Sequence, residues 1–580
     1  MRNTLEKIKN ALRYYSSILL KEKRAGILLM GFLSLFFFVG LGNFHLFDWD
    51  EINFAESARE MLESHNYSLV QINYTPFWEK PPFFFWLQAI SMKMFGINDF
   101  AARLPNAVFG FIYLITIFIM GRILKDNAFG IIWSLLYFGS FLPHLYFKSG
   151  IIDPVFNYFI FLAVYFTAQI FESKGTQPRY AMYAGLSIGI SFITKGPVGL
   201  LLLLLTLFCI IVYRYFSQSG LKDLSLSTTI EQSKKYVSEY SVWKNIYLFS
   251  LGFLIIVATW LLAEVYHHGF DILAKFIYFQ IELFNSPVAG HGQPFYYHFV
   301  VVLLGCFPAS VFALPSLIRS KNGPLCFFRV WMVALFWVVM IIFSISTTKI
   351  VHYSSMTYLP LTFLAALYVY GMIKKNSELK KYVLFIYLII GFFWATILTA
   401  ALFLLNHVSV IIPFIKDDFA VQSLLTPVFW SGYEPAIGLV FASGLIIALI
   451  CFLQKKHFKA LFAVSLSVGL TLLLLAIFVL PGVERFTQGP AIDFYQSLEY
   501  KDVYVETVGF KSYAQYFYKK SKPGQNPKRT EKEWLLYGDI DKPVYFVTKV
   551  NNTELDTISH IIKIKTEGGF SFYKRNNVSH

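Results

Sequence analysis

Carboxylates and ammonium groups recur at the ends of long apolar segments, where charged side chains are costly and are retained mainly for function. They are Asp48, Asp50, Glu51, Arg59, Glu79, Lys80, Asp153, Lys195 and Lys349. A carboxylate can take the proton of an attacking hydroxyl, and ammonium groups can stabilise a departing phosphate. If the segments bundle so that these residues meet in one cavity, they predict a transfer reaction with a phosphate leaving group.

Two of these motifs also have a structural interpretation. Asp50 and Glu51 begin an acidic stretch with a helical pattern, 50–64, and acids in a first turn cap a helix and offset its dipole. Lys80 precedes two prolines that fix the backbone, and it can either bind a phosphate or extend its ammonium group to the membrane surface. Both interpretations stay open from spacing alone.

The remaining candidates lie where one apolar segment gives way to the next. Asp153, followed by Pro154, can be a helix cap or the partner of Lys148. Lys195 precedes a helix-breaking Gly-Pro pair, and a turn alone does not require a lysine at that place. Lys349 has the same position relative to the segment that follows it.

Histidines gather in the segment 267–297 and directly after it. They are His267, His268, His291 and His298. None has a recognisable metal-binding spacing, although together with Glu79 they offer ligands for a divalent metal ion. The pattern therefore requires no cofactor and leaves a metal ion open. The four cysteines are scattered and predict no disulfide framework or thiolate metal site.

The elements that position these residues are membrane helices. Of the 580 residues, 56% are hydrophobic and 15% charged, and the mean hydropathy is +0.54. Apolar blocks of about 20 residues match the hydrocarbon thickness, and backbone groups in lipid must be satisfied within a helix. We expect an all-α polytopic membrane protein with about thirteen transmembrane helices. The expected spans are 26–46, 103–122, 128–147, 152–171, 180–195, 197–214, 246–266, 297–318, 327–346, 354–372, 382–405, 434–453 and 459–480.

The placement of positive charge predicts the orientation. Lys and Arg concentrate in alternate connections, and the side rich in them faces the cytoplasm. The N-terminus is then cytoplasmic, and an odd number of spans places the C-terminus outside. The net charge of +15 forms no basic stripe with interleaved aromatics, so nucleic acid is not an expected partner.

Two segments stand out on the predicted outer side. The loop 47–102 is acidic and contains an apolar stretch, Pro82–Phe95, that is too short to cross and is expected as an interfacial helix. The tail 481–580 is polar, with alternating runs at 503–508, 544–550, 561–565 and 570–574 and a helix at 513–518. We therefore expect a transmembrane domain, 1–480, followed by a small α/β domain, 481–580.

The motifs, in their order along the chain, resemble those of the GT-C glycosyltransferases. They are Asp50-Glu51 with Ala55-Glu56 and Arg59-Glu60, Glu79-Lys80-Pro81-Pro82, Ala102-Arg103-Leu104-Pro105, Asp153, Thr194-Lys195-Gly196-Pro197, and Lys349 with Tyr353. Within that superfamily the chain is similar to bacterial lipid A aminoarabinose transferases and to the protein O-mannosyltransferase family. The resemblance covers 26–480 in topology and is strongest over 48–200.

This resemblance implies an enzyme of the bacterial inner membrane, with a periplasmic active site and a periplasmic C-terminal domain. Such enzymes take sugar from a polyprenyl (undecaprenyl) phosphate and use no nucleotide sugar. The reaction is expected to be inverting, and the acceptor to be a lipid, a glycan or a protein. Besides these substrates, the expected partners are membrane lipids, and the chain is expected to act as a monomer.

The resemblance also implies a role for each motif. Asp50 matches an aspartate proposed as catalytic, with Glu51 beside it, and Asp153 matches a second important carboxylate. The expected donor-phosphate ligands are Lys80, Lys195, Lys349, Tyr353 and Arg59. Glu79 matches a position linked to a metal in some members, and His291 is its expected companion.

One difference from the aminoarabinose enzymes bears on the substrate. Asn53 and Phe54 stand where those enzymes usually have arginine and tyrosine, so a bidentate phosphate clamp is missing. The donor sugar is therefore less certain than the reaction class. The alternative functions are a transporter or flippase of a lipid-linked sugar and a non-catalytic polysaccharide-assembly protein. Transporters place ionisable groups near the bilayer midplane, whereas the charges here collect at one face.

Overall fold

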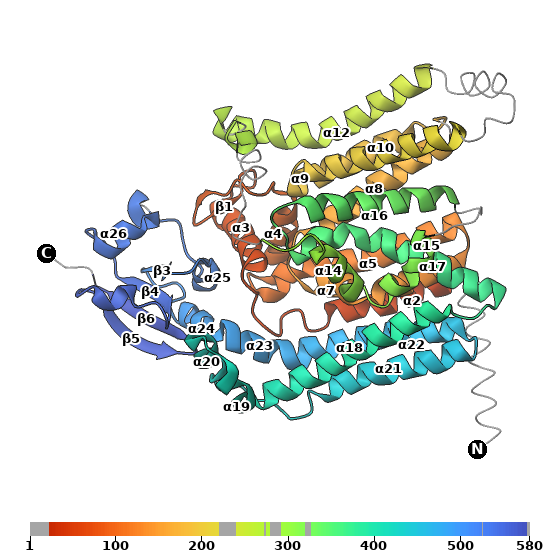
Figure 1. Ribbon diagram of the computed structural model, residues 1–580. Coiled ribbons are helices and arrows are strands. Elements are labelled where there is room, and N and C mark those ends of the chain that lie inside the picture. The colour runs from red at the N-terminus through yellow and green to blue at the C-terminus, as the bar shows by residue number, and fades with distance from the viewer. Residues whose placement is uncertain are drawn as a thin grey trace.

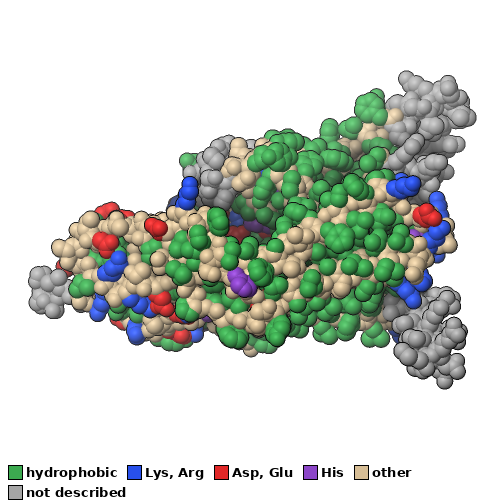
Figure 2. Space-filling view, turned by 60° about the horizontal axis from the view of Figure 1, so that its bottom comes forward, with side chains coloured by type: hydrophobic (Ala, Val, Ile, Leu, Met, Phe, Trp, Pro, Cys, Tyr) green, Lys and Arg blue, Asp and Glu red, His purple; other side chains and the backbone are tan. Residues whose placement is uncertain are grey.

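The chain folds into a long bundle of helices with a small sheet domain at one end (Figure 1). The computed structural model describes residues 22–173, 175–219, 239–271, 274–278, 292–318, 326–524 and 526–576. Hydrophobic side chains cover the flank of the bundle, and charged side chains gather at its two ends (Figure 2). This distribution is that of a protein surrounded by lipid along its sides.

The helices of the first half begin near the N-terminus and continue to residue 268. They are α2 (Lys23–Phe38), α3 (Asp50–Ser64), α4 (Phe83–Phe95), α5 (Asp99–Leu124), α6 (Asn127–Phe138), α7 (Phe141–Leu145), η1 (Tyr146–Lys148), α8 (Asp153–Glu172), α9 (Arg179–Lys195), α10 (Val198–Ser219) and α12 (Glu239–His268). A two-stranded hairpin, β1 (Gln71–Ile72) and β2 (Thr75–Pro76), lies between α3 and α4.

The second half of the bundle runs to the C-terminal domain. Its helices are α14 (Tyr297–Gly305), α15 (Ala309–Ile318), α16 (Cys326–Ile345), η3 (Val351–Thr357), α17 (Tyr358–Lys375), α18 (Lys381–Asn406), α19 (Val408–Ile411), η4 (Ile412–Phe414), α20 (Asp418–Leu424), α21 (Ala436–Leu453), α22 (His457–Leu474), η5 (Leu475–Val479), α23 (Leu480–Thr487) and α24 (Gly489–Ser497). The helix that begins at His457 continues past the predicted domain boundary at residue 480.

The chain is a multi-pass membrane protein. Among the described residues, nine helices are long and apolar enough to cross a membrane, and two bent helix pairs raise that number to eleven. Of the other predicted spans, α2 has 16 residues and α9 has 17. The helical, polytopic fold predicted from sequence is confirmed, while the number thirteen stays a prediction. The short apolar stretch after Pro82 forms α4, a 13-residue helix.

Two predicted spans are sharply bent. Helix α6 meets the segment Phe141–Lys148 at 82°, and α14 meets α15 at 118°. The first bend follows Gly139, where the hydroxyl of Ser140 bonds back to the carbonyl of Leu136. The second lies at Pro308, which has no N–H to continue the helical ladder. An apolar run reveals the length of such a segment but not its bend.

The C-terminal domain contains a four-stranded sheet in the order β3-β4-β6-β5. The strands are β3 (Tyr504–Val508), β4 (Val544–Lys549), β5 (Ile562–Glu567) and β6 (Phe570–Arg575). Strand β3 pairs with β4 in parallel, and the other pairs are antiparallel. Helical segments α25 (Ala514–Lys519), η6 (Pro527–Thr530), α26 (Lys532–Tyr537) and η7 (Glu554–Thr557) complete the domain. The predicted combination of strands with a helix near residue 515 is thus confirmed.

This domain is fastened to the loop that precedes α3 and to the β1–β2 hairpin. The Tyr518 hydroxyl accepts a hydrogen bond from the Leu46 amide and donates one to Asp99, both at 2.7 Å. The Tyr74 hydroxyl of the hairpin donates to the carbonyl of Ser521 at 2.9 Å. The aromatic rings of Trp49 and Tyr513 lie 5.1 Å apart. The chain that precedes α3, the β1–β2 hairpin and the C-terminal domain therefore form one continuous structure at this end of the bundle.

Candidate active site

A buried ion pair joins two predicted site residues that are 42 positions apart. The Lys195 ammonium donates to one oxygen of Asp153 at 2.7 Å. Asp153 is the first residue of α8 with Pro154 directly after it, and Lys195 is the last residue of α9, where Gly196 takes a φ of +83°. Because α8 and α9 pack together, the start of one and the end of the other meet.

The second oxygen of Asp153 is buried and has no hydrogen-bond partner among the described residues. A buried carboxylate oxygen without a donor is costly unless a ligand or water supplies one. The ammonium of Lys195 is also held by two rings, at 5.7 Å from the centre of Phe156 and 5.5 Å from that of Tyr353. Asp153 and Lys195 therefore form a rigid unit with one open acceptor.

Asp50 supplies a second, more accessible carboxylate to the same region. Its side chain is 32% exposed, and its carboxylate lies 3.6 Å from the imidazole of His352 at the start of η3. Electrostatic interactions link Asp50 with Lys195 and His352 with Asp153. Trp49 is the N-cap residue of α3, and no side chain makes a capping hydrogen bond there. Of the two structural roles considered for Asp50, capping and compensation of the helix dipole, only the second is therefore compatible with the structure.

Lys80 approaches this cluster from the loop before α4. Its ammonium lies 3.6 Å from the Glu79 carboxylate, and both side chains are partly exposed. Electrostatic interactions link Lys80 with Asp153 and with His352. The structure thus brings together Asp50, Asp153, Lys80, Lys195, Tyr353 and His352, which we call the charged cluster.

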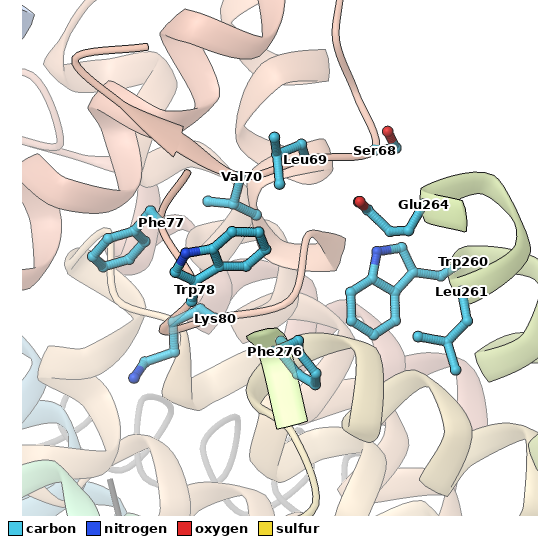
Figure 3. A pocket seen from close by; sticks show the side chains of 10 residues that line it. All are labelled: Ser68, Leu69, Val70, Phe77, Trp78, Lys80, Trp260, Leu261, Glu264 and Phe276. Carbon is cyan, nitrogen blue, oxygen red and sulfur yellow. The ribbon is translucent and has the colours of Figure 1, made fainter. Parts of the chain in front are cut away.

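Lys80 also lines a small cavity of about 30 Å³ between the loop that precedes α4 and α12. Figure 3 shows the indoles of Trp78 and Trp260 on either side of this cavity, with the ammonium of Lys80 directed away from Glu264. The other lining residues are Ser68, Leu69, Val70, Phe77, Leu261 and Phe276. The cavity therefore offers an apolar, aromatic surface that ends at a cation.

Lys349 lies beside this cluster without a direct contact to its carboxylates. Its ammonium is buried and donates to the carbonyl of Ser346 at 2.6 Å. His298 is the link, because it interacts electrostatically with both Lys349 and His352. A role of Lys349 at the donor phosphate stays a prediction.

Two other candidates are engaged in buried ion pairs of their own. Glu51 accepts two hydrogen bonds from the guanidinium of Arg103, at 3.0 and 2.8 Å, and two more from backbone amides. Although burial alone would raise the pKa of Glu51, the charge of Arg103 lowers it. Arg59 pairs with Glu56 through two contacts of 2.7 Å. The pair of Glu51 with Arg103 links α3 to α5, and the pair of Arg59 with Glu56 lies within α3, so the geometry favours structural roles for both residues.

A metal site near Glu79 stays a prediction. Among the described residues there is no group of three or more histidine, cysteine, aspartate or glutamate side chains able to hold a metal ion. The predicted companion His291 lies outside the described residues. Among the described residues, the ionic partner of Glu79 is Lys80.

The structure gives partners to two residues whose contacts the sequence did not indicate. His352 was part of the motif that contains Lys349 and Tyr353, but a single histidine without metal spacing gives no indication of its partners. Arg103 also binds the carbonyls of Leu41, Phe44 and His45. The signal for Arg103 was a charge inside an apolar segment, a type of residue that usually has a buried partner.

The fold and this one-ended cluster define a polytopic membrane protein with the GT-C fold. The chain superposes on the crystal structure of ArnT from Cupriavidus metallidurans bound to undecaprenyl phosphate with a TM-score of 0.68. The sequence identity is 17%, and the match covers 95% of this chain and 98% of that one. The apo form of the same protein gives a TM-score of 0.70.

Sequence comparisons agree with the fold. Residues 79–227 match the family of dolichyl-phosphate-mannose-protein mannosyltransferases. An undecaprenyl phosphate-α-4-amino-4-deoxy-L-arabinose arabinosyl transferase of Wigglesworthia glossinidia brevipalpis is 26% identical over 59% of this chain and 58% of its own length. A second transferase of that name, from Proteus mirabilis, is 26% identical over 78% of this chain and 75% of its own. The chain is thus similar in fold and in sequence to glycosyltransferases of the GT-C class.

Proposed function

We propose that this protein is an integral-membrane glycosyltransferase that moves a sugar from undecaprenyl phosphate to an acceptor hydroxyl or amine at the periplasmic face. The observation that carries this function is the charged cluster, in which two carboxylates and two lysines from distant segments meet at one end of the bundle. The comparisons support the donor class, because the relatives named above act on undecaprenyl-phosphate sugars.

The cluster supplies both halves of such a transfer. The acceptor oxygen or nitrogen attacks the anomeric carbon while its proton passes to Asp50, the accessible carboxylate of the cluster. The bond between that carbon and the phosphate oxygen breaks, and polyprenyl phosphate departs with the electron pair. Lys80 and Lys195 stabilise the developing charge. Attack opposite the leaving group inverts the anomeric configuration.

Asp153 has a different role in this scheme. One of its oxygens holds Lys195, and the unpaired oxygen can accept a hydrogen bond from a sugar hydroxyl. The aromatic side chains beside Lys80 offer a contact surface for the apolar chain of the carrier, with the phosphate at the lysine. The acceptor class, whether lipid, glycan or protein, follows from surfaces outside this cluster.

The substitution Asp50→Asn tests the proposed base. We expect turnover to fall by roughly 10²–10⁴-fold, because the amide keeps the shape of the side chain but cannot take the proton. The measurement is release of undecaprenyl phosphate by purified protein in nanodiscs that also contain an envelope extract as the source of acceptor, with undecaprenyl-phosphate 4-amino-4-deoxy-L-arabinose and a panel of other undecaprenyl-phosphate sugars as donors.

Asp418→Asn is the matched control, because Asp418 is likewise the first residue of a helix, α20, and is exposed. It removes a helix-dipole interaction of the same kind without touching the cluster. Turnover of Asp50→Asn within twofold of the wild type would remove Asp50 from the chemistry. Absence of turnover in the wild type with every donor of the panel would contradict the function itself.

A further inference from the structure

A second cavity lies in the C-terminal domain, away from the charged cluster. Its volume is about 240 Å³, and it opens between the start of β3, the end of α25 and the β1–β2 hairpin. Its lining is rich in cations, with Lys501, Lys519, Lys520, Lys522, Lys542 and Arg529. Only two acidic residues, Asp502 and Glu506, line the same cavity.

Lys519 is the central feature of this cavity. The residue is only 7% exposed, yet its ammonium has no ion pair or hydrogen bond among the described residues. Burial lowers the pKa of Lys519 to about 8; the charge of Asp502 opposes this shift, and the charges of Arg59 and Lys542 add to it. A largely buried lysine side chain without a hydrogen-bond partner is unfavourable, and a ligand that supplies negative charge would offset that cost.

The acids near Lys519 are already engaged elsewhere. Asp502 pairs with Lys542 at 2.6 Å. Glu506 accepts a hydrogen bond from the Tyr516 hydroxyl at 2.9 Å, and burial raises its pKa, which favours its neutral form. Lys520 pairs with Glu499 at 2.6 Å. An excess of positive charge therefore remains around the ammonium of Lys519.

Arg529, another residue that lines this cavity, supplies a second hydrogen-bond donor group. Its guanidinium donates to the carbonyl of Asn73 at 3.0 Å and lies 5.5 Å from the ring centre of Tyr74. A guanidinium has five N–H donors, so these contacts leave others for a ligand. Lys501 and Lys522 are exposed at the rim and have no acidic partner among the residues that the structure describes.

We propose that this cavity is a phosphate-binding site, with Lys519 and Arg529 as its principal ligands. A phosphate carries up to two charges and several acceptor oxygens, and this matches a buried ammonium, a guanidinium and rim lysines better than a single carboxylate does. The phosphate belongs either to a soluble compound or to the headgroup of an anionic lipid. The site binds phosphate whether or not the chain transfers a sugar, because none of its residues belongs to the charged cluster.

The test measures pyrophosphate binding to the purified full-length protein in nanodiscs by isothermal titration calorimetry. We expect the wild type to bind, Lys519→Met to bind at least tenfold more weakly, and Lys519→Arg to keep most of the affinity. Lys565→Met is the matched control, because Lys565 is a lysine of the same domain that pairs with Glu567 on β5, outside the cavity. Thermal unfolding of each variant shows whether its fold is intact.

The lipid composition distinguishes the two sources of phosphate. In zwitterionic phosphatidylcholine nanodiscs, pyrophosphate binds in either case. Phosphatidic acid in the nanodisc weakens pyrophosphate binding if the site takes a lipid headgroup, and leaves it unchanged if the site takes a soluble phosphate. The proposal is overturned if the wild type does not bind pyrophosphate in phosphatidylcholine, or if folded Lys519→Met binds it as tightly as the wild type.

Discussion

The two aspartates of the charged cluster differ in their partners and in their exposure. One oxygen of Asp153 accepts a hydrogen bond from Lys195, and the residue is buried. The carboxylate of Asp50 lies beside the imidazole of His352 and is partly exposed. A group that must exchange a proton with an incoming acceptor needs access, and a group that must hold a lysine needs burial. This difference in environment supports the distinct roles proposed for two chemically identical side chains.

At the residue scale, the Asp153–Lys195 pair can be tested by a double-mutant cycle. Lys195→Met and Asp153→Asn should each lower the free energy of unfolding by about 3–5 kcal/mol, because each leaves one buried partner uncompensated. The double variant should lose less than the sum, since it removes both charges together. Thermal unfolding in detergent, with turnover measured alongside, checks this prediction. Strictly additive losses would show that the two residues are not coupled.

Which residues take part could be anticipated better than how they pair. Asp153 and Lys195 were recognisable because charges at the ends of apolar segments are rarely neutral in function. Their direct contact depends on the packing of α8 against α9, a tertiary fact that spacing along the chain does not contain. The place of His352 in the cluster could not be predicted for the same reason, because the carboxylates it interacts with, Asp50 and Asp153, come from two other segments.

At the scale of elements, the start of α3 depends on one buried ion pair with α5. Glu51 and Arg103 are both almost inaccessible, and the same guanidinium binds three carbonyls of the chain that leads into α3. Asp50 is the neighbour of Glu51, so the position of the proposed base is set by its adjacent residue. Nothing in the acidic pattern of residues 50–64 indicated which acid faces inward.

The substitution Glu51→Gln should therefore destabilise the protein by about 3–5 kcal/mol. Because the folded-state pKa of Glu51 lies below its ordinary value, the stabilisation is complete above that ordinary value and is lost as the pH falls through the folded-state pKa. The loss on substitution should thus be equal at pH 6 and pH 8 and shrink only in acid. Thermal unfolding in detergent at several pH values measures it.

The exposed pair Lys565–Glu567 offers a control at the same scale. Glu567→Gln removes a partner from a pair that is nearly half exposed on both sides, and such pairs contribute only about 0–1 kcal/mol. A similar small effect for Glu51→Gln would mean that the junction between α3 and α5 does not rely on this charge.

At the scale of the whole molecule, the two ends of the described chain lie at opposite ends of the bundle (Figure 1). Helix α2 begins at the end far from the sheet domain, and β6 is part of that domain. The number of crossings, thirteen, and the placement of the two termini on opposite sides of the membrane stay predictions. The apolar pattern defined the segments well, but the bends at Gly139 and Pro308 arise from local breaks that hydropathy averages away.

The topology prediction follows from this arrangement and from the distribution of positive charge. A phosphatase reporter that is active only outside the cytoplasm, fused after His580, should be active, and a cytoplasmic fluorescent reporter at the same place should be dark. The same pair of reporters fused within the Lys-rich connection after α17 should give the opposite result. A C-terminal fusion that fluoresces in the cytoplasm would reverse the orientation and place the charged cluster on the inner side.

The confinement of the charged cluster to one end of the bundle has an electrical consequence. Moving one elementary charge across a membrane at 100 mV changes its energy by about 2.3 kcal/mol. In the proposed reaction, the proton, the departing phosphate and the lysines that receive it all lie at one end of the bundle, so no charge has to move from one end to the other during a turnover. We therefore expect the rate of such an enzyme to be independent of membrane potential and its chemistry to continue in a cell whose membrane is fully depolarised.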